Sequence, residues 1–196
     1  MDTWILAAFL GLGLAAATGL RTFLPLLMLS AVAHFGWLGI SLSESFAWLG
    51  SSAALATLAI ATVAELLADK IPLIDNALSA LGMISRPVAA AIAAGAVFTS
   101  LDASAAIIAG IIVGAPTALA VGTAQAGTRV ASTTATGGTA NPIVSIAEDV
   151  VSFIVALVAL VVPVLIPLVL IAVAWLAYRG SRRWRRRRPT SWAVQR

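Results

Sequence analysis

The sequence contains no cysteine and only one histidine, His34. A chain without cysteine forms no disulfide bond and offers no thiolate to a metal ion. One histidine does not build a multi-histidine metal centre within one chain. His34 stands at the end of an apolar run, where an interfacial side chain is the simpler interpretation. We therefore expect no metal site and no cofactor.

The motifs of membrane-embedded and nucleotide-handling enzymes are absent as well. The sequence has no Gly-x-Gly-Asp, no His-Glu-x-x-His and no Gly-x-Ser-Gly, which intramembrane proteases would carry. It also lacks the glycine-rich phosphate loop that precedes a Lys-Ser/Thr pair. We therefore expect that the protein is not an enzyme and has no catalytic residue.

Charged residues are scarce too. They make up 10% of the 196 residues, against 61% hydrophobic residues, and the mean hydropathy is +1.03. A soluble domain of this size needs more polar surface, whereas a multi-span membrane protein does not. We predict an all-α fold, with one polytopic helical transmembrane domain over residues 1–178 and about six crossings. The predicted location is the bacterial inner (plasma) membrane.

The few charges are divided unevenly along the chain. Residues 1–178 carry four basic and eight acidic side chains, whereas residues 179–196 carry eight arginines and no acid. Such a polybasic segment predicts a cytoplasmic tail that binds anionic lipid headgroups. Because it adjoins a span, we do not expect it to bind nucleic acid. Lys70 and Arg86 place the second connection on the same side, and both termini are therefore predicted to be cytoplasmic.

Five apolar runs are long enough to form membrane helices. Termini on one side require an even number of crossings, so a sixth crossing is needed. It is either the polar segment 130–149 or a hairpin at Pro163–Pro167. We favour the first, because the halves flanking Pro163 are short for separate spans. The five runs are residues 4–33 (interrupted at Gly19-Leu20-Arg21 and Pro25), 47–67, 77–101 (interrupted at Arg86-Pro87), 103–125 and 144–178.

Small residues recur every four positions in two of these runs. Such stripes let helices approach closely, which matters in lipid because no hydrophobic effect drives helices together there. One pair, Gly110 and Gly114, is also a GxxxG match. The stripes are Ala7, Gly11, Ala15 and Gly19 in the first run, and Gly110, Gly114, Ala118, Gly122 and Ala126 in the fourth.

The stretch 65–75 concentrates four charges in eleven residues. On a helix, Glu65 and Asp69 share a face, and Pro72 cannot continue that helix. We expect two carboxylates at a helix end, with Lys70 beside them and Asp75 beyond a turn. Ionisable groups at membrane depth indicate a functional site with partners nearby. The alternative is a helix end that reaches headgroup water.

Residues 127–142 are small and hydroxyl-rich, and Arg129 is their only charge. A solvent-exposed loop is one interpretation, although such loops usually carry several Asp, Glu or Lys residues. The alternative is a broken segment buried among helices, where irregular backbone is allowed next to protein or a water-filled cavity. We predict the second arrangement: residues 127–149 lie inside the protein, and Thr134 and Thr139 are shielded from solvent.

The two halves of the chain contain matching stretches. Gly19-Leu20-Arg21 matches Gly127-Thr128-Arg129, and Val63-Ala64-Glu65 matches Ile146-Ala147-Glu148. Two three-crossing halves would be inverted relative to each other, which is a common arrangement in transporters. The matches therefore favour inverted repeats over residues 4–101 and 103–178.

Several of these motifs together resemble one family. They are Glu65-x3-Asp69-Lys70-Ile71-Pro72-x2-Asp75, Gly19-x-Arg21-x3-Pro25, Arg86-Pro87 and Gly127-Thr128-Arg129. They look like the bacterial membrane family called domain of unknown function 4126, over most of residues 5–178. The tail lies outside the resemblance, which implies an integral membrane protein and no established activity.

The leading functional hypothesis is a small transporter or channel-like protein for an anionic solute or a lipid phosphate. Arg21 and Arg129, near expected helix breaks, would bind the anion with guanidinium groups and free backbone N–H donors. Thr128 and Asn141 are further candidate ligands. The expected proton or cation relay is Glu65, Asp69, Asp75, Glu148 and Asp149, with Lys70 and Arg86 as structural charge partners.

The alternative is a scaffold or assembly protein that transports nothing. In that case the arginine–carboxylate pairs only hold helices together. Charges that face a cavity favour transport, whereas charges fully paired in a dry interface favour the scaffold. The expected partners are membrane lipids and further copies of the chain in a homo-oligomer.

Overall fold

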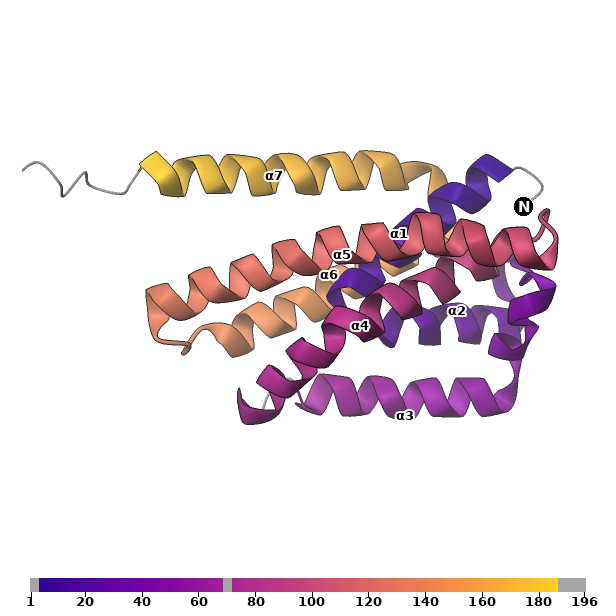
Figure 1. Ribbon diagram of the computed structural model, residues 1–196, viewed down its shortest axis with the longest axis horizontal. Coiled ribbons are helices and arrows are strands. Elements are labelled where there is room, and N and C mark those ends of the chain that lie inside the picture. The colour runs from indigo at the N-terminus through magenta and orange to yellow at the C-terminus, as the bar shows by residue number, and fades with distance from the viewer. Residues whose placement is uncertain (1–3, 69–71, 187–196) are drawn as a thin grey trace, which may run out of the picture. The chain divides into compact units, whose positions relative to one another are not determined.

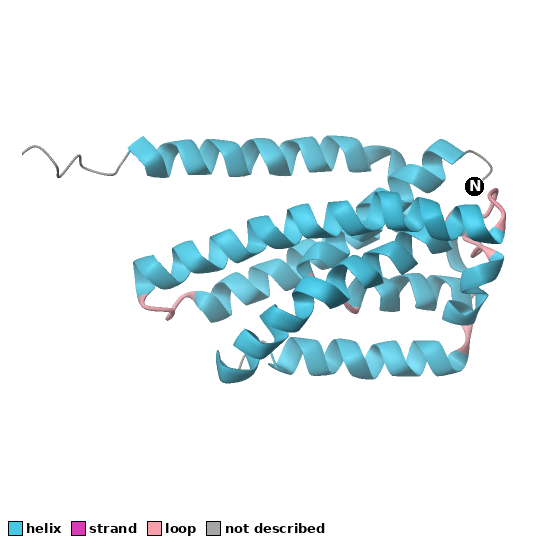
Figure 2. Cartoon of the chain, viewed as in Figure 1, coloured by secondary structure: helices cyan, strands magenta, loops and turns pink. Residues whose placement is uncertain are grey.

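The computed structural model describes residues 4–68 and 72–186 (Figures 1 and 2), and these form helices without any strand. The predicted all-helical fold is confirmed. The helices are α1 (Trp4–Leu20), α2 (Leu24–His34), η1 (Trp37–Gly39), η2 (Glu44–Gly50), α3 (Ser52–Ala68), α4 (Pro72–Ala96), α5 (Ala103–Thr136), α6 (Asn141–Val161), η3 (Pro163–Leu165) and α7 (Ile166–Arg186).

The chain forms two compact units, Met1–Ile166 and Pro167–Arg196. The boundary between them lies inside the stretch that was predicted as one domain, residues 1–178. The described part of the predicted tail, up to Arg186, is the end of α7. Its remaining residues, 187–196, lie outside the described part of the chain.

Two helices, α5 and α6, are long and apolar enough to cross a membrane. A third candidate is the pair η2 and α3, which are bent by 68° at their junction. Shorter apolar helices are α1, α2 and the segments 81–96 and 163–175. These lengths and compositions agree with the expected association with a membrane.

The first apolar run divides into α1 and α2 at residues 21–23. Pro25 lies in the first turn of α2, where its missing N–H would have had no partner within the helix. Near the start of α1, Ala7 packs against Phe98 and Ala106. The chain after α2 returns to this region, where the N–H of Ser43 donates to the carbonyl of Ala96 at 2.8 Å. The interruption expected near Arg21 and Pro25 is therefore present, but residues 4–33 are not a single span, because α1 and α2 form a hairpin.

The small-residue stripes form the contacts among α1, α4 and α5. A Cβ atom built on Gly114 would lie 2.3 Å from the carbonyl oxygen of Ala90, and one on Gly110 would lie 2.3 Å from that of Ala91. Only glycine allows the backbones of α4 and α5 to approach so closely. Ala15 packs between them, against Ala90 and Ala118. The predicted close packing along these stripes is confirmed.

The same contacts define the relative direction of α1 and α5. Ala7 meets Ala106, Ala15 meets Ala118, and a Cβ on Gly19 would touch Val121 at 2.8 Å. Residue numbers rise together along both helices, so α1 and α5 run in the same direction. The matched stretches that end in Arg21 and Arg129 are therefore parallel. This differs from the inversion that the repeat hypothesis expects of them.

Residues 127–149 are the ends of two long helices. α5 continues through Arg129 to Thr136, Gly137 and Gly138 adopt positive φ angles of 61° and 88° in the turn, and α6 begins at Asn141. Thr134 and Thr139 are exposed. The predictions of a separate crossing over 130–149 and of a shielded segment are therefore wrong. The hydroxyl groups remain compatible with a helix because they donate to carbonyls of the preceding turn, as Thr136 does to Ser132 at 2.8 Å.

The expected interruption at Arg86-Pro87 is also absent. α4 extends from Pro72 to Ala96 with Pro87 inside it. Pro72 itself begins α4, whereas α3 ends at Ala68, so the break expected at Pro72 is present. α4 thereby holds Arg86 in the middle of a helix that packs against α5.

Candidate functional site

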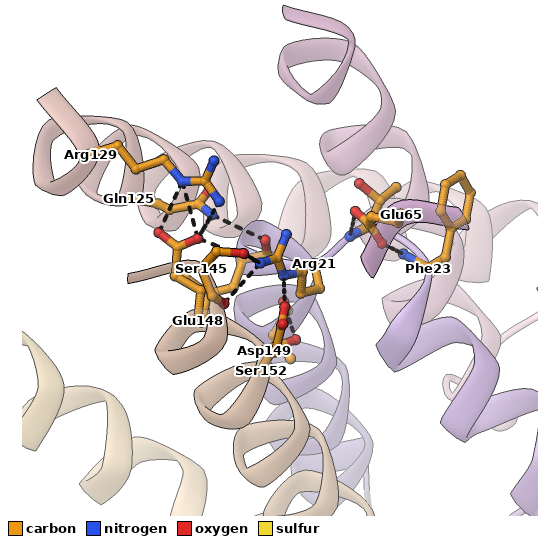
Figure 3. Close-up of polar contacts among 12 residues, drawn as sticks. Arg21, Phe23, Glu65, Gln125, Arg129, Ser145, Glu148, Asp149 and Ser152 are labelled. Carbon is orange, nitrogen blue, oxygen red and sulfur yellow. Dashed lines mark hydrogen bonds and ion pairs between the residues drawn. The ribbon is translucent and has the colours of Figure 1, made fainter. Parts of the chain in front are cut away.

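Arg21 directly follows α1 and is the centre of a buried ionic cluster (Figure 3). Its side chain is only 1% exposed, and its Nε forms an ion pair with Oδ1 of Asp149. Its Nη2 donates to the carbonyl oxygen and to Oγ of Ser145, both at 3.0 Å, and lies 3.8 Å from Oε2 of Glu148. These contacts hold the non-helical segment that follows α1 against one face of α6.

Arg129 and Gln125, both on α5, reach the same carboxylate of α6. Nη2 of Arg129 lies 2.6 Å from Oε2 of Glu148, and Nε lies 3.1 Å from it. Nε2 of Gln125 donates to this oxygen at 2.7 Å and also lies 3.4 Å from the carbonyl oxygen of Leu20. Glu148 thus joins α5 and α6, and it lies between two arginines that would otherwise repel each other.

Glu65 lies on α3 and forms the polar contact on the far side of Figure 3 from Arg129. Its Oε1 accepts the backbone N–H of Thr22 at 2.8 Å, and its Oε2 accepts that of Phe23 at 3.0 Å. A carboxylate at a helix N-terminus satisfies amide groups that have no partner inside the helix. The backbone donors at the Arg21 break, which were expected to bind an anionic ligand, therefore bind the protein's own carboxylate.

We expect Glu65→Ala to lower the free energy of unfolding by about 1–2 kcal/mol, because two N–H groups at the start of α2 lose their acceptor. Glu65→Gln should lose less, since it keeps one oxygen. Thermal melting in detergent measures the effect, and Glu44→Ala, at an exposed position, is the matched control. Equal melting temperatures for Glu65→Ala and Glu44→Ala would contradict this role.

Arg86 differs from the other two arginines in its partners. Its Nη1 donates to the side-chain oxygen of Gln125, whereas its Nε is buried without a hydrogen-bond partner. Within the residues that the structure describes, Arg86 forms no ion pair. A guanidinium group away from water is costly unless an anion compensates its charge. Arg86 therefore differs from Arg21 and Arg129, which both form ion pairs with carboxylates of α6.

A cleft of about 230 Å³ lies between α4 and α5 beside Arg86. Both Arg86 and Arg129 line it, and among the residues that the structure describes no acidic side chain lines it. The other polar groups are Thr123 and Gln125. The remaining lining residues are small or apolar: Gly82, Met83, Pro87, Ala118, Leu119, Gly122 and Ala126. The guanidinium groups of Arg86 and Arg129 can therefore bind an anion in this cleft.

The structure brings four of the predicted site residues together: Arg21, Arg129, Glu148 and Asp149. Two predicted ligands lie outside the cleft lining. Thr128 is exposed and donates to the carbonyl of Ala124 at 3.1 Å, and the amide of Asn141 donates to Thr133 at 3.0 Å. Asp69 and Lys70 lie outside the described residues, and so does the side chain of Asp75.

Gln125 and Ser145 belong to the cluster, but sequence reasoning did not select them. Gln125 could have been found, because it is the only amide in the run 103–126, and polar groups inside an apolar helix usually have a role. Ser145 gives no such signal, since serine is common in helices of this kind. Arg86 was expected to be a structural partner, and the structure places it at the cleft instead.

These features define a class of protein: a helical chain with apolar helices of membrane-crossing length and a buried cluster of arginines and carboxylates. Residues 8–183 match the family described as Domain of unknown function (DUF4126), and the chain belongs to this family. The resemblance seen in the sequence motifs is confirmed. No curated protein and no solved structure matches the chain.

Proposed function

We propose that the protein is a small polytopic membrane transporter or channel-like protein for an anionic solute or a lipid phosphate. The anion would bind in the cleft between α4 and α5. The observation that supports this most directly is Arg86, a partly buried cation without an ion pair among the described residues, in the wall of a cleft that Arg129 shares. A bound anion would supply the missing counter-charge, and phosphate and carboxylate groups suit guanidinium best.

The buried carboxylates would couple anion binding in this cleft to the movement of protons. Gln125 accepts a hydrogen bond from Arg86 and donates one to Glu148, so the cleft and the ionic cluster share one hydrogen-bonded chain. Arg129 also contacts both. Protonation of Glu148 would weaken its hold on Arg129 and release that guanidinium for the anion. The proposed proton relay therefore consists of Glu148 and Asp149.

The proposed topology follows from the positions of the cations. Arg21, Arg86 and Arg129 lie at one end of the hairpin formed by α1 and α2, and cationic residues favour the cytoplasmic side of an inner membrane. We place that end and the arginine-rich tail in the cytoplasm, with the tail on anionic lipid headgroups. The hairpin then places Trp4 on the opposite side. This revises the expectation that the chain starts in the cytoplasm. Termini on opposite sides require an odd number of crossings, so a seventh crossing would follow the six of α1–α6.

The second candidate function, a scaffold without transport, is favoured by one observation. Arg21 is buried and surrounded by Ser145, Glu148 and Asp149, as expected of a charge that only holds helices together. It does not line the cleft. We therefore assign Arg21 to the stability of the fold, and assign anion binding to Arg86 and Arg129.

The test is anion-dependent stability in detergent. We expect inorganic phosphate or a short alkyl phosphate to raise the melting temperature of the wild type, because a ligand at a hundred times its Kd stabilises the folded state by about 2.7 kcal/mol. Arg86→Gln and Arg129→Gln should fold and lose this increase. Arg179→Gln, an exposed arginine on α7, is the matched control and should keep it.

Flux of the same anion into proteoliposomes then separates transport from binding. A full increase in the melting temperature of Arg86→Gln would contradict the cleft as the binding site. Absence of any increase with phosphates and carboxylates in the wild type would favour the scaffold.

A further inference from the structure

The cleft between α4 and α5 combines a cationic interior with an apolar edge. Met83 on α4 is 74% exposed and Leu119 on α5 is 49% exposed, and both line the cleft together with the two arginines. Other exposed side chains of these two helices are apolar as well, since Ile84 on α4 is 74% exposed and Ile112 on α5 is 67% exposed. A ligand that fills the cleft therefore meets two guanidinium groups and exposed hydrocarbon side chains in one site.

The depth of the cleft fits the headgroup layer of a bilayer. α5 carries no charged residue from Ala103 to Thr128, a stretch of about 39 Å at about 1.5 Å per residue. The hydrocarbon core is about 30 Å thick, so Arg129 falls at or just beyond its boundary when α5 spans it. Arg86 lies at the same level, because it donates to Gln125, one turn before Arg129.

We infer that the ligand is an amphiphilic phosphate, whose phosphate group binds Arg86 and Arg129 while its alkyl chain lies along Met83 and Leu119. Such a ligand would reach the cleft sideways from the bilayer, between α4 and α5. The inference rests on the proposed anion-binding function and specifies its substrate class. A free phosphate would use only the cationic interior and would leave the apolar edge without a role.

Affinity for a series of phosphate monoesters tests the inference. Inorganic, methyl, butyl and hexyl phosphate are compared on the full-length protein in detergent, by the concentration that gives half of the maximal rise in melting temperature. We expect affinity to increase about threefold per methylene group, which is within the range for transfer of a methylene out of water. The increase in affinity should end when the alkyl chain of the phosphate ester extends beyond Met83 and Leu119.

Two sets of variants show which residues contact the alkyl chain and the phosphate group of the ligand. Met83→Ser and Leu119→Ser should flatten the dependence on chain length and leave the affinity for inorganic phosphate unchanged. Ile84→Ser is the matched control, because Ile84 is as exposed as Met83 but does not line the cleft, and it should keep the dependence. Arg86→Gln should weaken every member of the series at least tenfold.

Each result decides a separate point. Equal affinity for inorganic and hexyl phosphate in the wild type would refute an amphiphilic ligand. The proposal that the cleft binds an anion would still stand. Absence of binding throughout the series would overturn both the anion site and this inference. A chain-length dependence that survives in Met83→Ser, Leu119→Ser and Arg86→Gln would show partitioning into the micelle, and would likewise overturn the inference.

Discussion

Replacement of Arg21 by alanine is expected to lower the free energy of unfolding by about 3–5 kcal/mol, because it removes one partner of a buried ion pair. The Arg21 side chain is 1% exposed and that of Asp149 is 21% exposed. The substitution also leaves the carbonyl and hydroxyl of Ser145 without the Nη2 donor. Melting or denaturant titration in detergent measures the loss.

The double variant Arg21→Ala/Asp149→Ala is the control for this interpretation. Removing both charges should recover much of the loss, because no carboxylate is then left in the apolar interior without its cation. Arg129→Ala should cost less than Arg21→Ala, since its side chain is 14% exposed and water can replace part of its contacts. If Arg21→Ala melts like the wild type, the structural role of this arginine is refuted.

The second large effect is expected at the contact between α4 and α5. Gly114→Ala should destabilise the protein by about 3 kcal/mol, because overpacking of a close contact usually costs 1–3 kcal/mol and here the obstacle is backbone. The added Cβ would lie 2.3 Å from the carbonyl oxygen of Ala90 and 2.7 Å from the nitrogen of Ala91. The two helices must separate to accommodate it, and Gly114→Leu should not fold.

Gly127 provides a matched control on the same helix. A Cβ at this position meets no atom within 4 Å, so Gly127→Ala should stabilise the protein by up to about 1 kcal/mol through helix propensity. Melting temperatures of the two alanine variants, measured in one detergent, should therefore move in opposite directions. A shift of the same sign and size in both would show that the α4–α5 contact is looser than described.

The sequence alone determined the helical class and the helix faces that pack closely. Composition favours membrane-associated helices over a soluble domain of this size, and the four-residue spacing of small residues places Gly110, Gly114 and Ala118 on one face before any partner is known. Pro72 likewise marks the start of a new helix. These features are local, because each depends on the periodicity or the chemistry of neighbouring residues.

The tertiary structure alone decided which charges meet and where the cleft lies. Arg21 binds Ser145, which is 124 residues away in the chain, and no spacing in the sequence specifies such a pair. The reversal between α1 and α2 and the continuation of α5 to Thr136 arise from packing and from hydroxyl groups that fit a helix as well as a loop. The sequence could therefore supply the cations, whereas the arrangement of α4, α5 and α6 decided that Arg21 is paired and that Arg86 faces a cleft.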